Sequence, residues 1–302
     1  MDGPHGLAVT ARDFGLRGPR GWAFRDVRVD AGPGSLIAVA GPSGSGRTCL
    51  LLALTGRMRP TDGTATVGGL RLPRQMSALR RISALAHVPG VTDLDPALTV
   101  AEHLRERALL QRRFGASARD LLRPRAERAA KARLLADTAL SAAGLDPEAL
   151  PKGLRTAVRD LERTEALRLS IALALAGRPR LLGVDDADLK LSVAEREEIW
   201  SLLASIAASG TTVVAVCGEA PGDAVTVSTR PDTAPRTAPD GGEAGDDGKD
   251  DEDGEGSAVD EPGDDGEDTA DTAHGDTRRE DTDHTDDVTE EAAGALAETR
   301  RA

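Results

Sequence analysis

The stretch that constrains this sequence most is Gly41-Pro42-Ser43-Gly44-Ser45-Gly46-Arg47-Thr48, which stands between two apolar runs. The run at 36–40 predicts a buried strand and the run at 49–54 a helix, so the glycine-rich stretch turns from one into the other. Glycines in such a turn let successive N–H groups point into one hollow, and the helix N-terminus adds partial positive charge. We therefore predict a phosphate-binding loop that holds a nucleotide. The predicted contacts are Gly41, Pro42, Ser43, Gly44, Ser45, Gly46, Arg47, Thr48 and Cys49.

One position of this loop departs from the usual pattern. The pattern Gly-x-x-x-x-Gly-Lys-Ser/Thr holds everywhere except at Arg47, where it has lysine. The hydroxyl of Thr48 is placed to bind a magnesium ion. Arginine can pair with a phosphate, but its planar and bulkier head does not reproduce the point charge of lysine. Nucleotide binding should therefore survive this change better than hydrolysis.

Charge is distributed very unevenly along the chain. Residues 241–302 hold 24 of the 51 acidic side chains and 5 of the 38 basic ones, so residues 1–240 carry a positive excess. From residue 231 onward the sequence has no periodicity and cannot bury enough apolar surface to offset its ordering entropy. We expect residues 231–302 to form a disordered acidic tail. Its default role is that of a solvated chain, with cation binding and contact with a basic partner surface as alternatives.

The composition also bears on the compartment. The two cysteines, Cys49 and Cys217, are too few for a disulfide framework and suit a reducing environment. The sequence starts without the basic and apolar regions of a signal peptide, and no apolar run approaches the ~20 residues that cross a bilayer. We expect a cytoplasmic protein that, if it serves a membrane, does so from outside the lipid.

The hydrophobic pattern predicts an α/β domain over residues 1–230. Short strands and turns fill its first part, and a helical block at about 99–176 interrupts it, opened by a capping-box pattern at 99–102. The segment 181–216 has the strand–helix–strand pattern of a right-handed crossover between parallel strands. The expected strands lie at 7–10, 22–29, 36–40, within 61–69, 82–88, 181–184, 211–216 and 224–228, and further helices at 47–56 and 192–208.

Taken together, these features resemble the nucleotide-binding domain of the ATP-binding-cassette (ABC) transporter family over residues 7–230. The best local support is the segment 175–186, Leu-Ala-Gly-Arg-Pro-Arg-Leu-Leu-Gly-Val-Asp-Asp, which looks like the family's helix end, "GRP" turn and Walker B strand. Leu98-Thr99-Val100 and the segment 63–69 resemble two further family motifs. The resemblance implies a P-loop NTPase fold, an ABC-type ATPase domain with an inserted helical subdomain. It also implies ATP and Mg²⁺ as ligands.

The resemblance assigns roles to two acidic residues. Asp185 matches the Walker B aspartate, so it is expected to hold magnesium together with Thr48. Asp186 falls where the family has its catalytic glutamate. Its side chain is one methylene shorter, and a misplacement near 1 Å can cost on the order of 100-fold in rate. We expect Asp186 to be the catalytic residue of a site with poor catalytic geometry.

Other family positions are changed more severely. The signature segment, LSGGQ in the family, aligns with Leu161-Glu162-Arg163-Thr164-Glu165. In the family the serine and the glycine backbone of this segment grasp a γ-phosphate on the facing subunit. Here two glutamates would bring negative charge towards that phosphate, and no glycine remains to let the backbone approach. Gly90 and Gly218 stand where the family has a glutamine and a histidine near the γ-phosphate, and 189–192 replaces its aspartate loop. The nucleotide cradle is mostly kept and the hydrolysis machinery mostly lost. For the aromatic residue that stacks on adenine, Phe14 is the first candidate and Trp22 the second; either could instead be a packing residue.

The leading hypothesis is an ATP-binding subunit of an ABC-type transport system. Such a subunit is implied to work with a separately encoded membrane permease, as a homodimer or as a heterodimer with another nucleotide-binding subunit. It would sit on the inner face of the cell membrane, with no nucleic-acid partner expected. A non-hydrolysing pseudo-ATPase with a regulatory or scaffolding role is the alternative. An independent P-loop kinase or GTPase fits less well, because a helical block separates the loop from Walker B.

Overall fold

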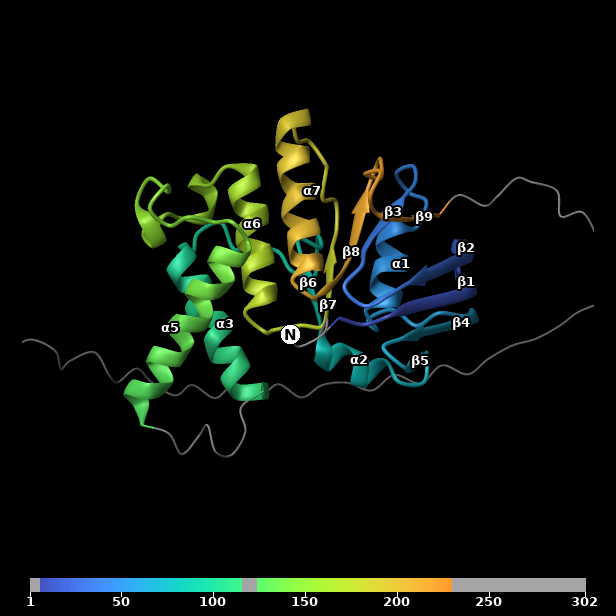
Figure 1. Ribbon diagram of the computed structural model, residues 1–302, viewed down its shortest axis with the longest axis horizontal. Helices are drawn as coiled ribbons and strands as arrows, with labels where there is room; N and C mark the ends of the chain where they lie inside the picture. Colours follow the sequence, from blue (N-terminus) through green and yellow to red (C-terminus); the bar gives the residue numbers. More distant parts are fainter. Residues whose placement is uncertain (1–5, 116–123, 230–302) are drawn as a thin grey trace, which may run out of the picture. The chain divides into compact units, whose positions relative to one another are not determined.

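The computed structural model describes residues 6–115 and 124–229 (Figure 1). The chain divides into two units, Met1–Arg236 and Thr237–Ala302, and every described residue lies in the first unit. The expected disordered tail at 231–302 lies outside the described residues.

The described strands form two sheets. One is antiparallel, in the order β2-β1-β4-β5, and the other is parallel, in the order β6-β7-β8-β3-β9. The antiparallel strands are β1 (Val9–Gly18), β2 (Gly21–Ala31), β4 (Asp62–Val67) and β5 (Leu70–Leu72). The parallel strands are β3 (Leu36–Ala40), β6 (Ser83–Ala86), β7 (Leu181–Val184), β8 (Thr212–Cys217) and β9 (Val225–Ser228).

The apolar runs seen in the sequence become the centre of the parallel sheet. Strand β8 is buried at every position, and β3 lies between β8 and β9, with Ile37 paired to Val214 on one side and to Val225 on the other. Strands covered on both faces read as continuous apolar runs, which is why these segments were recognisable without alternation. The short edge strand β9 completes the sheet.

Each face of the parallel sheet packs into its own hydrophobic cluster. Along β3, Ala38 belongs to one cluster and Ile37 to the other, as the period of two in a strand requires. The first cluster contains residues of the helices that lie between residues 100 and 208, among them Ile171 and Leu203. The second contains residues of the first helix and the antiparallel sheet, such as Leu50. The two faces thus join different parts of the chain to one sheet.

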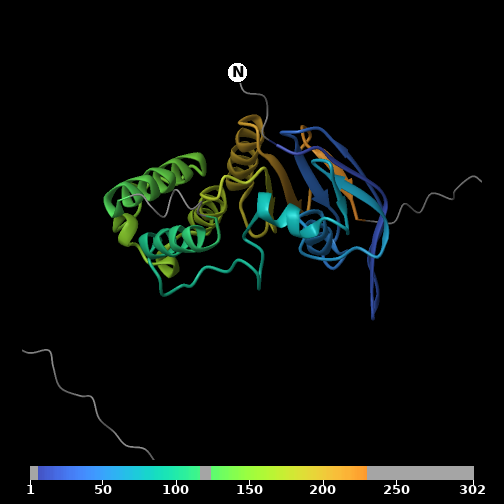
Figure 2. The same ribbon diagram turned by 90° about the horizontal axis from the view of Figure 1, so that it is seen from below.

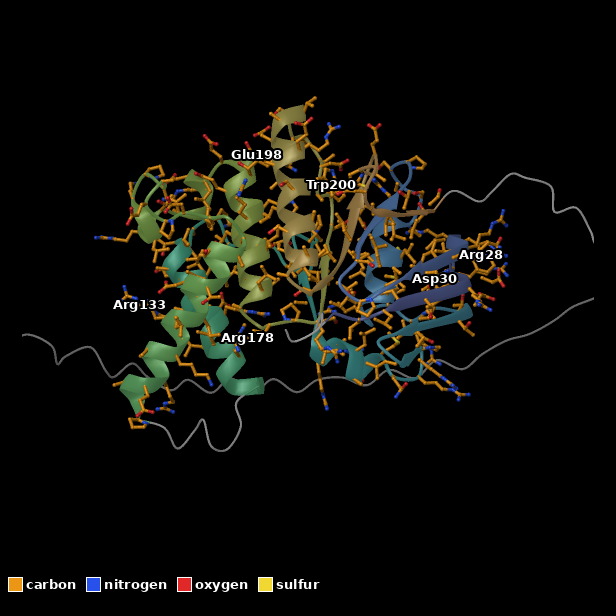
Figure 3. The ribbon with its side chains drawn as sticks, in the orientation of Figure 1. Arg28, Asp30, Arg133, Arg178, Glu198 and Trp200 are labelled. Carbon is orange, nitrogen blue, oxygen red and sulfur yellow. The ribbon has the colours of Figure 1, made fainter. Side chains whose placement is uncertain are left out.

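The helices gather in two places (Figures 1 and 2). Three of them, α3, α5 and α6, lie together at one side of the sheets, and α7 runs between this group and the parallel sheet. The Arg168 guanidinium on α6 pairs with the Glu198 carboxylate on α7 at 3.1 Å, which links the two helices. Figure 3 labels Glu198. The helices are α1 (Arg47–Leu54), α2 (Met76–Ile82), α3 (Val100–Gly115), α5 (Arg125–Ala142), α6 (Arg163–Leu175) and α7 (Val193–Ala208), with single 3₁₀ turns at Gly153–Arg155 and Val158–Asp160.

A buried hydroxyl ties the start of the chain to the parallel sheet. The Thr212 hydroxyl accepts hydrogen bonds from the N–H groups of Leu7 (2.9 Å) and Gly34 (3.0 Å) and donates one to the Leu7 carbonyl (2.8 Å). Thr212 is fully buried, so losing these bonds would leave polar groups unpaired in the interior.

The structure agrees with some of the predicted elements and differs from others. The first hairpin, β1–β2, runs well past the strands expected at 7–10 and 22–29, and it contains register shifts that break the simple alternation. Helix α1 ends at Leu54 rather than at residue 56. Strand β5 and helix α2 were not predicted, because each is short and draws on tertiary contacts more than on local pattern. Strands β7 and β8 are parallel neighbours joined by α7, as expected.

Among the residues described, none of the helices combines the length and the apolar character that a membrane crossing requires.

Candidate functional site

The glycine-rich stretch forms a tight loop between β3 and α1. Gly44 and Gly46 have φ angles of +80° and +83°, a region that favours glycine. The loop also approaches other backbone closely: a Cβ on Gly46 would lie 1.9 Å from the Ala23 carbonyl oxygen. The Ser45 N–H donates to the Pro42 carbonyl at 3.2 Å, which closes the turn. The glycine spacing is therefore required by the backbone path.

The Ser45 side chain connects the loop to the end of β9. Its hydroxyl lies 2.5 Å from that of Thr229, and a Cβ on Gly41 would meet both hydroxyl oxygens, at 2.8 and 2.5 Å. Thr229 was not anticipated as part of the site. It follows a short edge strand and carries no motif of its own, so only the sheet order could have revealed it.

The two residues expected to hold magnesium lie together. The Thr48 hydroxyl donates a hydrogen bond of 2.8 Å to Asp185 Oδ2, and the Asp186 N–H donates to Asp185 Oδ1 at 3.1 Å. Asp185 is only 1% exposed, and burial raises the pKa of its carboxyl above the ordinary value. In the described parts of the chain, no three His, Cys, Asp or Glu side chains gather around a point. One carboxylate and one hydroxyl fit Mg²⁺, which binds few protein ligands and takes the rest from phosphates and water.

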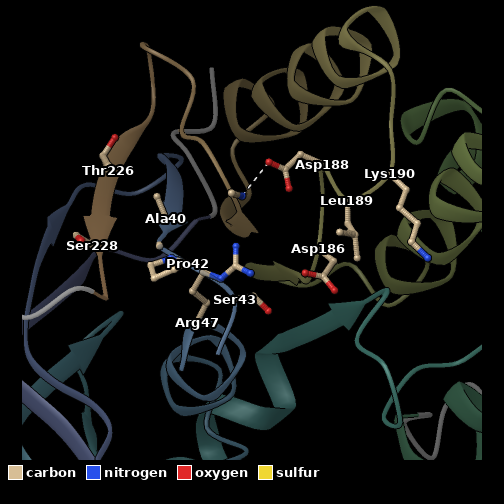
Figure 4. A pocket seen from close by; sticks show the side chains of 12 residues that line it. Ala40, Pro42, Ser43, Arg47, Asp186, Asp188, Leu189, Lys190, Thr226 and Ser228 are labelled. Atoms are coloured by element: carbon tan, nitrogen blue, oxygen red, sulfur yellow. Dashed lines mark hydrogen bonds between the residues drawn. The ribbon is translucent and has the colours of Figure 1, made fainter. Parts of the chain in front are cut away.

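Arg47 begins helix α1 and reaches across to the far side of the loop. Its Nη1 donates a hydrogen bond to the Cys217 carbonyl at the end of β8. Figure 4 shows the guanidinium beside the turn that follows β8, away from Thr226 and Ser228 on β9. The Cys217 thiol, buried beneath, has its pKa raised to about 12, chiefly by that burial. This contact was not predicted, because 170 residues separate its partners.

A cavity of about 640 Å³ opens over this loop (Figure 4). That volume suits a small-molecule ligand of nucleotide size. Asp188, which the sequence did not single out, accepts hydrogen bonds from the N–H groups of Gly218 (2.8 Å) and Glu219 (3.4 Å) and so fixes the turn after β8. The sequence contained one indication of this role, since Asp188 follows two other acidic residues closely in the segment Asp185-Asp186-Ala187-Asp188. The lining residues are Ala40, Gly41, Pro42, Ser43, Arg47, Asp186, Asp188, Leu189, Lys190, Gly218, Thr226 and Ser228.

Asp186, the expected catalytic residue, lines this cavity just past the end of β7. Its φ angle is +45°, an uncommon conformation for a residue with a side chain. Such strain is found at functional sites. Figure 4 shows its carboxylate on the same side of the loop as Arg47.

The expectation for Phe14 is wrong. Its side chain is fully buried, and its ring lies 5.7 Å from that of Phe24 inside the second cluster. A ring without exposed surface cannot stack on a nucleotide. Trp22, the second candidate, is 43% exposed and has the Arg17 guanidinium 5.8 Å from its ring centroid. The pairing of β1 with both β2 and β4 buries Phe14, and the sequence around it does not reveal that pairing.

The segment aligned with the family signature forms the start of α6. Glu162 is the N-cap residue of the helix, and its N–H donates a hydrogen bond to Glu165 Oε2 at 2.8 Å, so the two glutamates make a capping box. Between them, Arg163 Nε donates to the Leu189 carbonyl at 2.8 Å, which joins this segment to the loop after β7. The two glutamates thus cap helix α6, and their carboxylates lie at its N-terminus.

The loop that contains Gly90 has a backbone reason for glycine at this position. Gly90 has a φ angle of +74°, and its N–H donates to Asp93 Oδ2 at 2.8 Å. Just before it, burial lowers the pKa of His87, and the Arg163 charge lowers it further. A positive φ explains glycine here on backbone grounds alone.

Replacing Asp185 by asparagine is expected to leave the metal-free chain as stable as the wild type or more so at neutral pH. The asparagine Oδ1 can still accept from the Asp186 N–H, and its Nδ2 can donate to the Thr48 hydroxyl, which then acts as acceptor instead of donor. Because burial raises the pKa of the wild-type carboxyl, the wild type loses stability relative to the variant as pH rises from 3.8 through the raised value. Urea unfolding in a metal chelator at about pH 4 and about pH 8 measures this difference. A gap that does not grow with pH would refute it.

Comparison with known proteins bears on both fold and family. The ABC transporter family profile matches residues 24–188, more than half of the 302-residue chain. The Nod factor export ATP-binding protein I of Cupriavidus metallidurans is 31% identical over 186 residues, 62% of this chain and 54% of the relative. The cytochrome c biogenesis ATP-binding export protein CcmA of Pseudomonas putida is 39% identical over 101 residues, 32% of this chain and 47% of the relative. The matches thus span about half the length of these relatives.

Solved structures agree at the level of the fold. The ATP-binding cassette MJ0796, a dimer bound to ADP and Pi, superposes with a TM-score of 0.53 at 22% identity, over 70% of this chain and 88% of that one. The cbiO1 protein of Clostridium perfringens, part of the cbiONQ transporter complex, gives a TM-score of 0.55 at 17% identity, over 70% of this chain and 78% of its own. The described part therefore has the P-loop NTPase fold of ABC ATPase cassettes, and the chain belongs to the ABC transporter family.

Proposed function

We propose that this chain is the ATP-binding subunit of an ABC-type transport system, a cytoplasmic protein held at the membrane by a separate permease. The observation that carries the proposal is the Thr48–Asp185 hydrogen bond beside the glycine loop, because it brings a hydroxyl and a buried carboxylate to one magnesium position. The ATP-binding export proteins among its relatives support the transport role. Residues 231–302 are proposed to be an acidic extension of the 1–230 nucleotide-binding domain.

The residues present fit ATP–Mg. Loop N–H groups and the start of α1 would bind the phosphates, and Thr48 and Asp185 would hold the ion. When bound, magnesium neutralises charge on the phosphate oxygens. Arg47 adds a cation at the same end of the cavity. Trp22, exposed on β2, is the aromatic side chain we propose for the adenine.

Hydrolysis by this chain alone is proposed to be slow. Asp186 is a short carboxylate in place of a glutamate, and neither Gly90 nor Gly218 has a side chain that could orient water. The carboxylates of Glu162 and Glu165 remain at the start of α6, where the family uses neutral groups. A second nucleotide-binding subunit with an intact signature segment would supply what this chain lacks.

A groove with basic walls is our proposed contact for the permease. It has a volume of about 1000 Å³ between the helices α3 and α5 and the start of β6, with Arg178 at the end of α6 (Figure 3). Burial lowers the pKa of Arg107 there, and its Nε has no hydrogen-bond partner. Apolar side chains line the same groove. Its basic side chains are Arg81, Arg107, Lys131 and Arg178, and its leucines are Leu110, Leu134 and Leu135.

This mixture fits a permease segment that carries carboxylates beside apolar side chains. The Arg107→Glu variant is expected to leave the membrane fraction of cells that also produce the permease. Sedimentation of the membranes measures this release. The matched control is Arg105→Glu, since Arg105 is an exposed residue on the same helix that does not line the groove. Equal release of both variants would contradict the placement of the permease.

A second candidate is a pseudo-ATPase that binds nucleotide without hydrolysing it and acts as a regulatory or scaffolding module. The observation that favours it is the pair of glutamates at the signature position, Glu162 and Glu165. Their negative charges repel the phosphate of a nucleotide bound to a facing subunit, whether that subunit is a second copy of this chain or a different protein. The two functions differ in their dependence on a partner. Turnover that rises when an intact second subunit and permease are added supports the transport subunit, and turnover that stays at zero supports the regulator.

The test is ATP–Mg binding by the full chain, compared with the Arg47→Ala variant. The wild type is expected to gain melting temperature at millimolar ATP–Mg, and the variant to bind about 10- to 100-fold more weakly, because it lacks a charged hydrogen-bond donor. Matching circular dichroism spectra without nucleotide provide the control for folding. Absence of any nucleotide-dependent shift in the wild type would overturn both candidate functions.

A further inference from the structure

The groove between α3, α5 and the start of β6 contains two buried hydrogen-bond donors that lack an acceptor. Among the described residues, neither Arg107 Nε nor Gln111 Nε2 has a hydrogen-bond partner. Both side chains belong to α3 and line the groove, and their spacing of four residues places them on one face of the helix. A buried donor without a partner is destabilising, so a ligand that brings acceptor atoms would bind favourably here.

The two donor side chains approach each other at Gly177, just after the end of α6. A Cβ built on Gly177 would lie 3.3 Å from Arg107 Nη2 and 3.6 Å from Gln111 Nε2. The backbone does not explain this glycine, because its φ angle is outside the positive range that favours glycine. The missing side chain instead leaves the guanidinium and the amide room to lie together at one end of the groove.

The walls of the groove are positively charged. Its lining, all of it in the described part of the chain, includes four cationic side chains and neither Asp nor Glu. Further positive charge lies close by, since burial and the charges of Arg80 and Arg107 lower the pKa of Arg57 to about 10. Buried charges in proteins are normally paired. The groove therefore suits an anionic ligand.

The number of donors favours a phosphate over a carboxylate. A carboxylate offers two oxygens, whereas a phosphate monoester offers three acceptor oxygens and close to two negative charges. The five N–H donors of a guanidinium and the two of an amide exceed what a carboxylate can accept. Arg178, directly after Gly177, adds a further guanidinium to the lining (Figure 3).

The rest of the lining is apolar and large enough to hold more than an inorganic ion. The groove has a volume of about 1000 Å³, which is the size of a site for an organic molecule. Leu134 is 66% exposed and Leu110 43% exposed, so an alkyl chain laid against them would remove apolar surface from water. The leucines of the lining are Leu110, Leu134 and Leu135.

We propose that this groove binds an amphiphilic phosphate monoester, with its phosphate on Arg107 and Gln111 and its alkyl chain along the three leucines. A lipid headgroup and a soluble phosphorylated molecule share this chemistry. The ligand and the permease segment would compete for the same groove, so the ligand would release the chain from its permease. Only this competition rests on the proposed function; the binding itself does not.

The experiment titrates the full chain with octyl phosphate, inorganic phosphate and octanoate in a calorimeter. Octyl phosphate is expected to bind about 10-fold or more tightly than inorganic phosphate, because its chain buries apolar surface. It should also bind more tightly than octanoate. Since the phosphate loop is a second place for a phosphate, the titration is repeated with millimolar ATP–Mg. Octyl phosphate that ATP–Mg displaces would belong to the loop and would overturn the proposed site.

Three variants assign the probe to the groove. Arg107→Gln should weaken octyl phosphate about 10-fold or more through loss of a charged donor, and Gln111→Met, of similar size, about 3-fold. The matched control is Arg105→Gln, an exposed arginine of α3 outside the groove lining, which should stay within about 2-fold of the wild type. Equal losses in Arg107→Gln and Arg105→Gln overturn the site. Should Arg107→Gln not melt cooperatively, Gln111→Met decides by the same comparison.

Vesicles distinguish the two sources of the ligand. Sedimentation with phosphatidylcholine vesicles that contain phosphatidic acid, lost in Arg107→Gln, identifies a lipid. Octyl phosphate binding without vesicle binding identifies a soluble phosphate monoester. A wild type that binds octyl phosphate no better than inorganic phosphate overturns the proposal, even if it binds ATP–Mg normally. Binding in the groove by a chain that does not bind ATP–Mg would overturn the proposed function alone.

Discussion

Replacing Gly46 by alanine is expected to abolish ATP–Mg binding and to lower the free energy of unfolding by about 3 kcal/mol or more. Two costs combine at this position. The φ angle of +83° is unfavourable for any L-residue, and the new Cβ would lie 1.9 Å from the Ala23 carbonyl oxygen of β2. No real contact is that short, so either the loop or β2 must move. Urea unfolding and calorimetric titration with ATP–Mg measure the two effects.

Gly44 offers a matched control within the same loop. Its φ angle of +80° is nearly that of Gly46, but nothing lies within 4 Å of a Cβ built on it. The Gly44→Ala variant therefore carries only the backbone cost, about 1–2 kcal/mol. Equal destabilisation of both variants would show that the contact with β2 is unimportant. A Gly46→Ala chain that still binds ATP–Mg normally would remove the loop from the site altogether.

Removing the two signature-position carboxylates is expected to let the chain dimerise in the presence of ATP–Mg. In the family, this segment meets the γ-phosphate bound on the facing subunit. The Glu162→Ser/Glu165→Gln variant removes two negative charges from the segment that each subunit presents to the phosphate on the other subunit. Serine and glutamine still form a capping box at the start of α6. Because juxtaposed like charges cost several kcal/mol, the dimer should tighten by on the order of 100-fold. Analytical ultracentrifugation with ATP–Mg measures this change.

The control removes the same charge elsewhere. Glu148 and Glu197 are exposed residues outside the start of α6, so a Glu148→Gln/Glu197→Gln chain has the same net charge as the test variant. We expect this control to remain monomeric with ATP–Mg, like the wild type. Dimerisation of the control, or of the unchanged chain, would show that the glutamates at α6 do not set the barrier. It would also favour a homodimer over a mixed pair of subunits.

The sequence was most informative where structure is local. The glycine spacing at 41–48 and the apolar runs on either side predicted β3, the loop and α1, because loop conformation and strand burial depend on neighbouring residues. The strand–helix–strand unit of β7, α7 and β8 was predicted for the same reason. The nearness of Thr48 to Asp185 followed from the family resemblance rather than from their spacing.

The features that the sequence did not predict depend on contacts between residues far apart in the chain. Phe14 is buried because β1 pairs with strands on both sides, and a local pattern around Phe14 does not report that. The Arg47–Cys217 contact joins residues 170 positions apart. The capping role of Glu162 and Glu165 was present as a sequence pattern, but the comparison with the family signature drew attention to their charge instead.

The position of β3 in its sheet has a consequence for synthesis. Both neighbours of β3, the strands β8 and β9, come from the last described part of the chain, and Thr212 binds Leu7 across 205 residues. A ribosome-bound chain that ends before β8 therefore has the glycine loop but neither of the strands that pair with β3. Such non-local pairings form late and slowly. The nascent chain should acquire its phosphate-binding loop in one step, only after residue 229 has left the ribosome.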